Sequence, residues 1–180
     1  YIILKTVDGG TNWTTIANGF GDGLTSIHMV NETTGYNVGL AGHNNKTTNG
    51  GASWINTPGA DYMPFTEVYY PSVKVGFIVG QDNTIRRTMD SASTFTTLTP
   101  DATFTGAYHA VFFIDNQEGY IAGDDKTVLK TIDAGTNWTV EHQELSSLIN
   151  FKSIHFPNPS VGYAAGDNGT VLKTIEGTGL

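Results

Sequence analysis

The sequence predicts an all-β protein, and its composition is the first evidence for this class. Charged residues make up only 14% of the 180 residues, against about 25% in an average protein, and 22 residues are Gly. The chain is rich in β-branched and turn residues, which favour strands over helices. A hydrophobic content of 38%, with 3 Trp, 8 Tyr and 9 Phe, is enough for a folded core. We therefore expect strands joined by tight turns.

An internal repeat is the second observation, and it defines the elements. A segment of the form Thr-x-Asp-x-Gly-x-Thr/Ser-Trp, with variations, occupies residues 6–13, 47–54, 88–95 and 131–138, and a fifth copy opens at residue 174. The copies are about 42 residues apart, a spacing typical of repeated supersecondary units. A second motif, Gly-Tyr/Phe-x-Val/Ala-Gly, precedes each copy after the first, at residues 35–39, 76–80, 119–123 and 162–166.

Each period contains four short extended segments separated by turn residues. In the first full copy they are residues 26–30, 35–40, 44–48 and 54–57. Alternating apolar and polar residues in such segments indicate strands, and four in succession predict an antiparallel meander. Repetition of this unit predicts a β-propeller, in which each four-stranded blade buries its faces against its neighbours.

The blade limits follow from the repeat. We expect a partial blade over residues 1–19, blades over 20–60, 61–101 and 102–145, and a partial blade over 146–180. A closed ring needs about four to eight blades, so the pattern favours an incomplete ring or a piece of a larger propeller. The alternative is a small ring closed by the terminal strands.

The repeated Thr-x-Asp segment is predicted to be structural. Its Asp can accept hydrogen bonds from nearby backbone N–H groups, its Gly supplies a positive φ, and its aromatic residue packs between blades. Copies at blade spacing point apart around a ring and do not converge on one substrate. The residues with this expected role are Asp8, Trp13, Asn49, Trp54, Asp90, Phe95, Asp133, Trp138 and Glu176.

These segments resemble the Asp-box, or bacterial neuraminidase repeat. Together with the Gly-Tyr-x-Val/Ala-Gly motif they are most similar to the photosystem II stability and assembly factor-like propellers, over essentially the whole chain. The resemblance implies a propeller fold and leaves function open, because such repeats occur in glycosidases, sorting receptors, assembly factors and bacterial surface proteins. Sialidases with this repeat need an arginine cluster, whereas Arg86 and Arg87 are neighbours that point to opposite faces of one strand.

Charge and cysteine content exclude several functions. The net charge is −8, so the chain lacks the basic footprint that nucleic acid binding requires. No apolar run approaches the roughly 20 residues of a membrane span, so we expect no membrane insertion. The absence of Cys excludes disulfides and thiolate metal sites. We expect no catalytic residue, no metal and no cofactor.

Binding is predicted on the rim opposite the repeated boxes. The loops there differ between copies while the boxes do not, as expected for loops that carry function on a repeated scaffold. These loops combine acidic and aromatic residues. The predicted binding residues are Asp22, Tyr62, Phe65, Asp82, Phe104, Tyr108, Asp124, Asp125 and Asp167.

The predicted function is a non-enzymatic protein interaction or assembly module of a bacterial protein that is extracellular, periplasmic or at the cell surface. The alternative is a carbohydrate-binding or glycoside-hydrolase-type propeller fragment, in which rim aromatics stack on sugar rings. Hydrolysis would need two rim carboxylates about 5 to 9.5 Å apart. The expected partner is accordingly a protein or a glycan.

Overall fold

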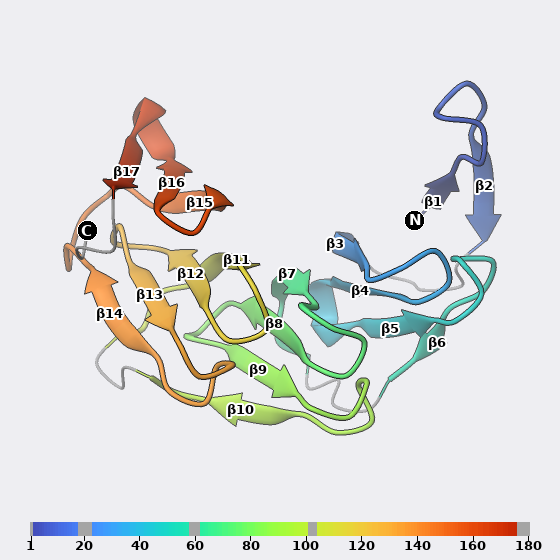
Figure 1. Cartoon of the computed structure of the whole chain (residues 1–180), viewed down its shortest axis with the longest axis horizontal. Coiled ribbons are helices and arrows are strands. Elements are labelled where there is room, and N and C mark those ends of the chain that lie inside the picture. Colours follow the sequence, from blue (N-terminus) through green and yellow to red (C-terminus); the bar gives the residue numbers. More distant parts are fainter. Residues whose placement is uncertain (1, 18–22, 58–61, 101–103, 176–180) are drawn as a thin grey trace.

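The computed structural model describes residues 2–17, 23–57, 62–100 and 104–175. Within these residues, seventeen strands form five antiparallel sheets, two of them incomplete. The sheets succeed one another along an open arc, with β3, β7, β11 and β15 on its inner side (Figure 1). No helix in the described residues is long and apolar enough to cross a membrane.

Strand order in each sheet follows chain order, so every sheet is an up-and-down meander. The first sheet has two strands, β1 (Ile2–Lys5) and β2 (Thr14–Ala17). The second contains β3 (Leu24–Met29), β4 (Gly35–Gly39), β5 (Asn44–Thr47) and β6 (Ile55–Asn56). The third contains β7 (Phe65–Tyr69), β8 (Gly76–Gly80), β9 (Ile85–Thr88) and β10 (Thr96–Leu98).

The fourth sheet contains β11 (Tyr108–Phe113), β12 (Gly119–Gly123), β13 (Val128–Thr131) and β14 (Thr139–His142). The fifth contains β15 (Phe151–Asn158), β16 (Val161–Gly166) and β17 (Val171–Ile175). Short 3-10 turns at Leu40–Gly42 and Asp167–Gly169 join two of the strand pairs. The all-β propeller of four-stranded antiparallel blades is therefore confirmed.

The ring is open in the part of the chain that the structure describes. No strand ladder there joins the sheet of β1 and β2 to the sheet of β15, β16 and β17. The alternative of a small ring closed by the terminal strands is thus not what the structure shows. The expected blade limits at residues 19/20, 60/61 and 101/102 lie outside the described residues, and the limits as a whole stay predictions.

Both glycines of the Gly-Tyr/Phe-x-Val/Ala-Gly motif are required by close packing. In β12, a Cβ on Gly119 would lie 2.6 Å from the Phe113 ring, and a Cβ on Gly123 would lie 2.5 Å from the Ala107 carbonyl oxygen. Both distances are well inside van der Waals contact. The motif therefore fixes how closely the second strand of a blade approaches the first.

Aromatic stacking holds neighbouring blades together. The motif aromatic of one blade stacks on an aromatic at the end of the next blade's first strand. The three pairs are Tyr36 with Tyr70, Phe77 with Phe113 and Tyr120 with Phe156, with ring centroids 3.5, 4.4 and 4.0 Å apart. Each pair belongs to a buried cluster that spans two sheets. The core of the protein therefore lies between blades.

Each inner strand carries a β-bulge at the same position. The register shifts just after the first residue of β3, β7, β11 and β15. A bulge leaves one residue unpaired and re-aims its side chain. The four residues at the bulges are Thr25, Thr66, His109 and Lys152.

Candidate functional site

The Asp-boxes are closed hydrogen-bond networks within single turns. In the fourth sheet, Thr131 Oγ1 donates to Asp133 Oδ1 over 2.9 Å and accepts the backbone N–H of Gly135 over 2.9 Å. Asp133 also accepts the backbone N–H of Asn137 over 2.9 Å and its side-chain amide over 2.7 Å. These contacts involve only residues of the box itself, so they stabilise the turn.

The same network recurs in the boxes at residues 6–13 and 88–95, and Asn49 takes the place of the Asp at residues 47–54. The backbone and side-chain hydrogen bonds from Asn137 lower the pKa of Asp133 to about 2. Equivalent bonds from Asn12 and Thr94 lower the pKa of Asp8 and Asp90 to about 2. A base with so low a pKa is a poor proton acceptor near neutral pH.

The box aromatics differ in burial. Trp138 is 8% exposed and meets Phe77 and Phe113 edge-on, whereas Trp13 is 59% exposed. Trp54 and Phe95 are half-buried. Glu176, the expected fifth box residue, lies outside the described residues. Burial is thus greatest at Trp138, which packs against Phe77 of the preceding blade.

The bulges build a charged cluster on the rim opposite the boxes. In the first two full blades, the bulge side chains are threonines that bond the next inner strand: Thr25 Oγ1 donates to the Phe65 carbonyl over 2.8 Å and Thr66 Oγ1 to the Tyr108 carbonyl over 2.6 Å. The next two bulges carry His109 and Lys152 instead. The Nε2 atom of His109 lies 2.7 Å from Asp124 Oδ1 and 2.9 Å from Lys152 Nζ.

Asp124 is held in place by the backbone as well. It follows β12, and its Oδ2 accepts the backbone N–H of Ala107 over 2.9 Å. Burial raises the pKa of Asp124, but this bond, the contact with His109 and the charge of Lys152 outweigh burial and hold the pKa below its usual value. The carboxylate is therefore ionised at neutral pH and already occupied by partners within the chain.

The Nε2 atom of His109 lies beside an acceptor, the Asp124 carboxylate, and a donor, the Lys152 ammonium group. Nε2 of His109 can donate to Asp124 or accept from Lys152, but a single imidazole nitrogen does not do both at once. When Nε2 is protonated, its N–H group donates a hydrogen bond to Asp124, and the ring nitrogen is then no acceptor for the ammonium group of Lys152. Lys152 is the most exposed member of the cluster, with 45% of its side chain accessible against 28% for Asp124 and 16% for His109.

A second group of charges borders this cluster. Lys126 Nζ pairs with Glu144 Oε2 over 2.8 Å, and the backbone N–H of Glu144 donates to the Asp125 carbonyl over 2.9 Å. The backbone N–H of Asp125 donates to Asn150 Oδ1 over 3.3 Å. These bonds tie the turn after β12 to the segment that leads into β15.

The other predicted rim residues differ in exposure and in hydrogen bonding. Tyr62 is 86% exposed, Asp82 is exposed in a turn with φ of 51°, and Asp167 is half-buried and accepts the backbone N–H of Asn150 over 3.2 Å. Asp22 lies outside the described residues. As binding residues, these and the acids of the cluster stay predictions.

The prediction that aromatic residues are exposed on the rim is wrong for three of them. Phe65, Phe104 and Tyr108 are 0%, 2% and 0% exposed. Phe65 and Tyr108 are the first residues of β7 and β11, just before the bulge, and their rings pack into the clusters between blades. Phe104 stacks on Tyr108 with ring centroids 5.0 Å apart. A ligand at the rim cannot stack on these rings.

His109 and Lys152 are the residues that sequence reasoning missed. A signal for them existed, because aligning the inner strands puts them at the positions of Thr25 and Thr66. Two threonines replaced by a histidine and a lysine at one repeat position are a change of chemistry within a constant scaffold. Among the described residues, no group of three or more His, Asp or Glu side chains is placed to hold a metal ion.

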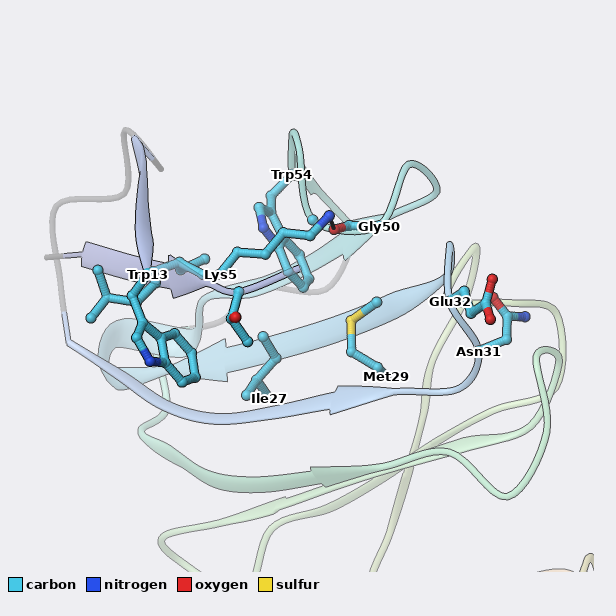
Figure 2. A pocket seen from close by; sticks show the side chains of 12 residues that line it. Lys5, Trp13, Ile27, Met29, Asn31, Glu32, Gly50 and Trp54 are labelled. Carbon is cyan, nitrogen blue, oxygen red and sulfur yellow. Dashed lines mark hydrogen bonds between the residues drawn. The ribbon is translucent and has the colours of Figure 1, made fainter. Parts of the chain in front are cut away.

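A groove separates the two-stranded sheet from the first full blade (Figure 2). It has a volume of about 320 Å³ and lies between β1 and β3. Trp13, Ile27, Met29 and Trp54 contribute apolar surface, and Lys5 reaches across to donate from Nζ to the Gly50 carbonyl over 2.6 Å. The lining is mainly apolar.

Comparison with known proteins agrees with this architecture. Residues 87–175 match the model of the photosynthesis system II assembly factor YCF48 family, whose repeat is the BNR repeat. A comparison with curated proteins gave no match. The chain is a β-propeller built from BNR-type repeats. Its similarity to the YCF48 family model extends over residues 87–175, just under half of the chain.

Solved structures share the fold at low sequence identity. A structure described as YCF48 bound to D1 peptide is 16% identical with a TM-score of 0.77, covering 97% of this chain and 57% of that one. YCF48 from Cyanidioschyzon merolae is 15% identical with a TM-score of 0.73, covering 97% and 63%. The GH74 enzyme of Niastella koreensis is 14% identical with a TM-score of 0.76, covering 94% and 32%. The chain thus spans about three fifths of the YCF48 chains.

Proposed function

We propose that the chain is a non-enzymatic protein interaction or assembly module of an exported or cell-surface bacterial protein, and that it holds a polypeptide partner on the rim opposite the Asp-boxes. The observation that carries the proposal is the cluster of His109, Asp124 and Lys152. Two bulges carry ionisable side chains where the first two full blades carry threonines, at the rim where the loops vary. The related propeller described as YCF48 bound to D1 peptide supports a peptide as the partner.

The cluster offers a cation to that partner. Asp124 accepts from Ala107 and faces His109, so its charge is satisfied within the chain. The ammonium group of Lys152 is 4.0 Å from Asp124 Oδ1, has three donors, and reaches solvent. A carboxylate or backbone carbonyl of the partner takes the donors of Lys152 that the cluster does not use. A charge-assisted bond of this kind is roughly twice as strong as a neutral one.

A glycan partner has less support. Binding of sugar rings by stacking needs exposed aromatics, and of the four aromatics predicted on the rim Phe65, Phe104 and Tyr108 are buried while Tyr62 is exposed. The likeness to GH74 enzymes is one of fold at 14% identity. The exported or cell-surface setting is supported by the Cys-free composition and the low content of charged residues, and fractionation of the source cells tests it directly.

The test uses a variant that the chain itself suggests. His109→Thr with Lys152→Thr restores the threonines of the first two bulges, so the inner strands should keep their bonds. A random linear peptide library is selected on the native chain, and the enriched peptides are measured by fluorescence anisotropy. We expect the double variant to bind these peptides at least tenfold more weakly, while the control Asp115→Asn, at an exposed residue in the turn after β11 that is not part of the predicted rim, binds them unchanged.

Two results would overturn the proposal. One is the enrichment of peptides whose affinity the double variant does not change. The other is the absence of any enriched peptide together with binding on a glycan array, which would favour the carbohydrate-binding alternative. Circular dichroism melting of the double variant checks that its fold is intact.

A further inference from the structure

Two leucines are exposed on the segment that joins β14 to β15, at the rim opposite the Asp-boxes. Leu145 is 61% exposed and Leu148 is 91% exposed. Their segment, residues 143–150, follows the last strand of the fourth sheet and leads into the inner strand of the fifth (Figure 1). A single exposed leucine is ordinary on a protein surface, whereas apolar side chains that gather on one loop indicate a site of interaction.

The exposure of Leu148 belongs to its position in the repeat. Leu148 lies four residues before the bulge of β15, and the residues four before the bulges of β7 and β11 are Tyr62 and Thr105. Both are exposed, Tyr62 at 86%, although the sheets that flank each of them have all four strands. Complete neighbouring blades therefore leave this position in solvent, and the exposure of Leu148 is not a consequence of the incomplete fifth sheet.

Backbone hydrogen bonds fix this loop to the turn after β12. The N–H of Glu144 donates to the Asp125 carbonyl over 2.9 Å, and the N–H of Lys126 donates to the Ile149 carbonyl over 3.0 Å. Within the loop, the N–H of Ser147 donates to the Glu144 carbonyl over 2.9 Å. The two leucines are thus presented by an ordered turn. A partner that binds there loses little free energy to ordering the loop, because the loop is already ordered.

Ser146, between the two leucines, has a left-handed backbone conformation with φ of 66°. This conformation is uncommon for residues other than glycine. Residues held in such conformations persist where the surrounding structure fixes them, and they gather at ligand-binding sites. The strained residue of the loop therefore coincides with its apolar patch.

Lys152 adds a positive charge to the patch. It lies four residues after Leu148, so their Cα atoms are at most about 14 Å apart, a span that about five residues of an extended partner cover. Two acids of this part of the rim are engaged within the chain, because Glu144 pairs with Lys126 over 2.8 Å and Asp124 belongs to the rim cluster. The ammonium group of Lys152 keeps donors for a partner.

We propose that Leu145, Leu148 and Lys152 form one docking surface for a partner polypeptide segment in which a leucine, isoleucine or phenylalanine lies within four residues of an aspartate or glutamate. The apolar side chain packs on the two leucines, and the carboxylate accepts from the Lys152 ammonium group. Because the chain carries a net charge of −8, the rest of its surface disfavours an acidic segment. The inference rests on the proposed function, since it names the chemistry of the polypeptide held at that rim.

The test selects a random linear peptide library on the native chain and sequences the enriched peptides. We expect them to combine an apolar and an acidic residue at this spacing. Their affinities are measured by fluorescence anisotropy. Leu145→Ser with Leu148→Ser should weaken binding at least tenfold and leave the melting temperature nearly unchanged, because both side chains are exposed. The matched control Val7→Ser with Ile132→Ser removes two side chains that are 89% and 72% exposed on the Asp-box segments, and it should bind unchanged.

Two charge variants test the acidic half of the partner. Lys152→Thr places at the bulge of β15 the residue that the first two full blades carry there. Peptides selected on this variant should keep the apolar residue and lose the preference for an acid. Asp125→Asn removes a negative charge from the turn that fixes the loop, so it should strengthen the binding of the acidic peptides.

The outcomes separate this inference from the proposed function. Peptides that His109→Thr with Lys152→Thr weakens, but that the leucine variant binds unchanged, would leave the proposed function standing and overturn the leucine surface. Enriched peptides that need the leucines but lack an acidic residue would overturn the chemistry assigned to the partner. The absence of any enriched peptide would overturn both proposals.

A second copy of the chain is a different occupant of the same patch. Analytical ultracentrifugation of the native chain should show a monomer. A dimer that the variant Leu145→Ser with Leu148→Ser dissociates would overturn the assignment of this surface to another polypeptide.

Discussion

Two interfaces in this protein are built on the same repeat positions and behave differently. Between the third and fourth sheets, Phe77, Phe113 and Trp138 form a closed aromatic cluster. Between the first and second sheets, Met29 takes the place of Phe113 and is 41% exposed, and Trp54 takes the place of Trp138 and is half-buried. Burial of a repeat position is thus set by the strand that faces it. A blade surface is an interface only when the preceding blade supplies its second strand.

The largest effect should come from truncating an equivalent residue in each interface. Phe113→Ala removes a ring that is 3% exposed and stacked on Phe77, and we expect the free energy of unfolding to fall by about 3–5 kcal/mol. Met29→Ala should cost about 0.5 kcal/mol, as for a surface position. Urea denaturation measures both. Equal losses would mean that the groove is covered in solution, which would break the comparison.

An intermediate effect should follow from adding one methyl group to the boxes. Gly135 and Gly10 occupy the same box position with φ of 71° and 92°, so both pay a similar conformational cost on mutation to Ala. A Cβ at Gly135 would overlap the Phe77 ring, whereas the nearest atom to a Cβ at Gly10 is 3.9 Å away on Trp13. We expect Gly135→Ala to destabilise by about 1–3 kcal/mol more than Gly10→Ala.

Thermal melting of the two glycine variants, at matched concentration, checks the difference. The box at residues 88–95 carries Ala92 at this position, with φ of 68°, so Ala is compatible with the turn itself. If both variants melted at the same temperature, the packing of Phe77 against the box turn would be looser than the structure shows.

The smallest effect should be a dependence of stability on acid pH in the boxes. Hydrogen bonds from Asn137 lower the pKa of Asp133 in the fold to about 2, below its ordinary value of 3.8. A lowered carboxylate pKa stabilises the fold above about pH 4, and this contribution is lost as the pH falls through 2. We therefore expect the melting temperature to fall between pH 4 and pH 2.

A double variant isolates this effect. Asp133→Asn with Asn137→Ser reproduces the pair Asn49 and Ser53, in which Asn49 Oδ1 accepts the Ser53 N–H over 2.9 Å and no carboxyl titrates. Its melting temperature should change less between pH 4 and pH 2 than that of the native chain. An unchanged slope would show that the other carboxylates, and not the box, govern acid unfolding.

The repeat allowed most of the fold to be predicted, because strand alternation and turn residues recur in register. The Gly-Tyr/Phe-x-Val/Ala-Gly motif and the boxes correctly indicated four strands per blade. The first strand was expected to start at residue 26, whereas β3 starts at Leu24, before the bulge. A bulge breaks the alternation that reveals a strand, so the residues on its N-terminal side look like loop.

The same bulge explains the errors at the rim. A one-residue shift in register moves side chains to the opposite face of a strand. Phe65 and Tyr108 therefore point into the core although they follow loop sequence, while His109 points to the rim although it lies within a strand. Burial against a neighbouring blade depends on contacts between residues about 40 apart, which local patterns do not encode.

The bulges also allow a constant strand ladder and a variable surface chemistry to coexist in a repeated protein. At each bulge one side chain has no place in the strand ladder, so its identity is not dictated by pairing. Thr25, Thr66, His109 and Lys152 show that one such position accepts a hydroxyl, an imidazole or an amine on an otherwise constant blade. Duplication of a blade therefore copies the scaffold together with one position whose residue is free to vary. The rim opposite the Asp-boxes can thus change its chemistry one blade at a time.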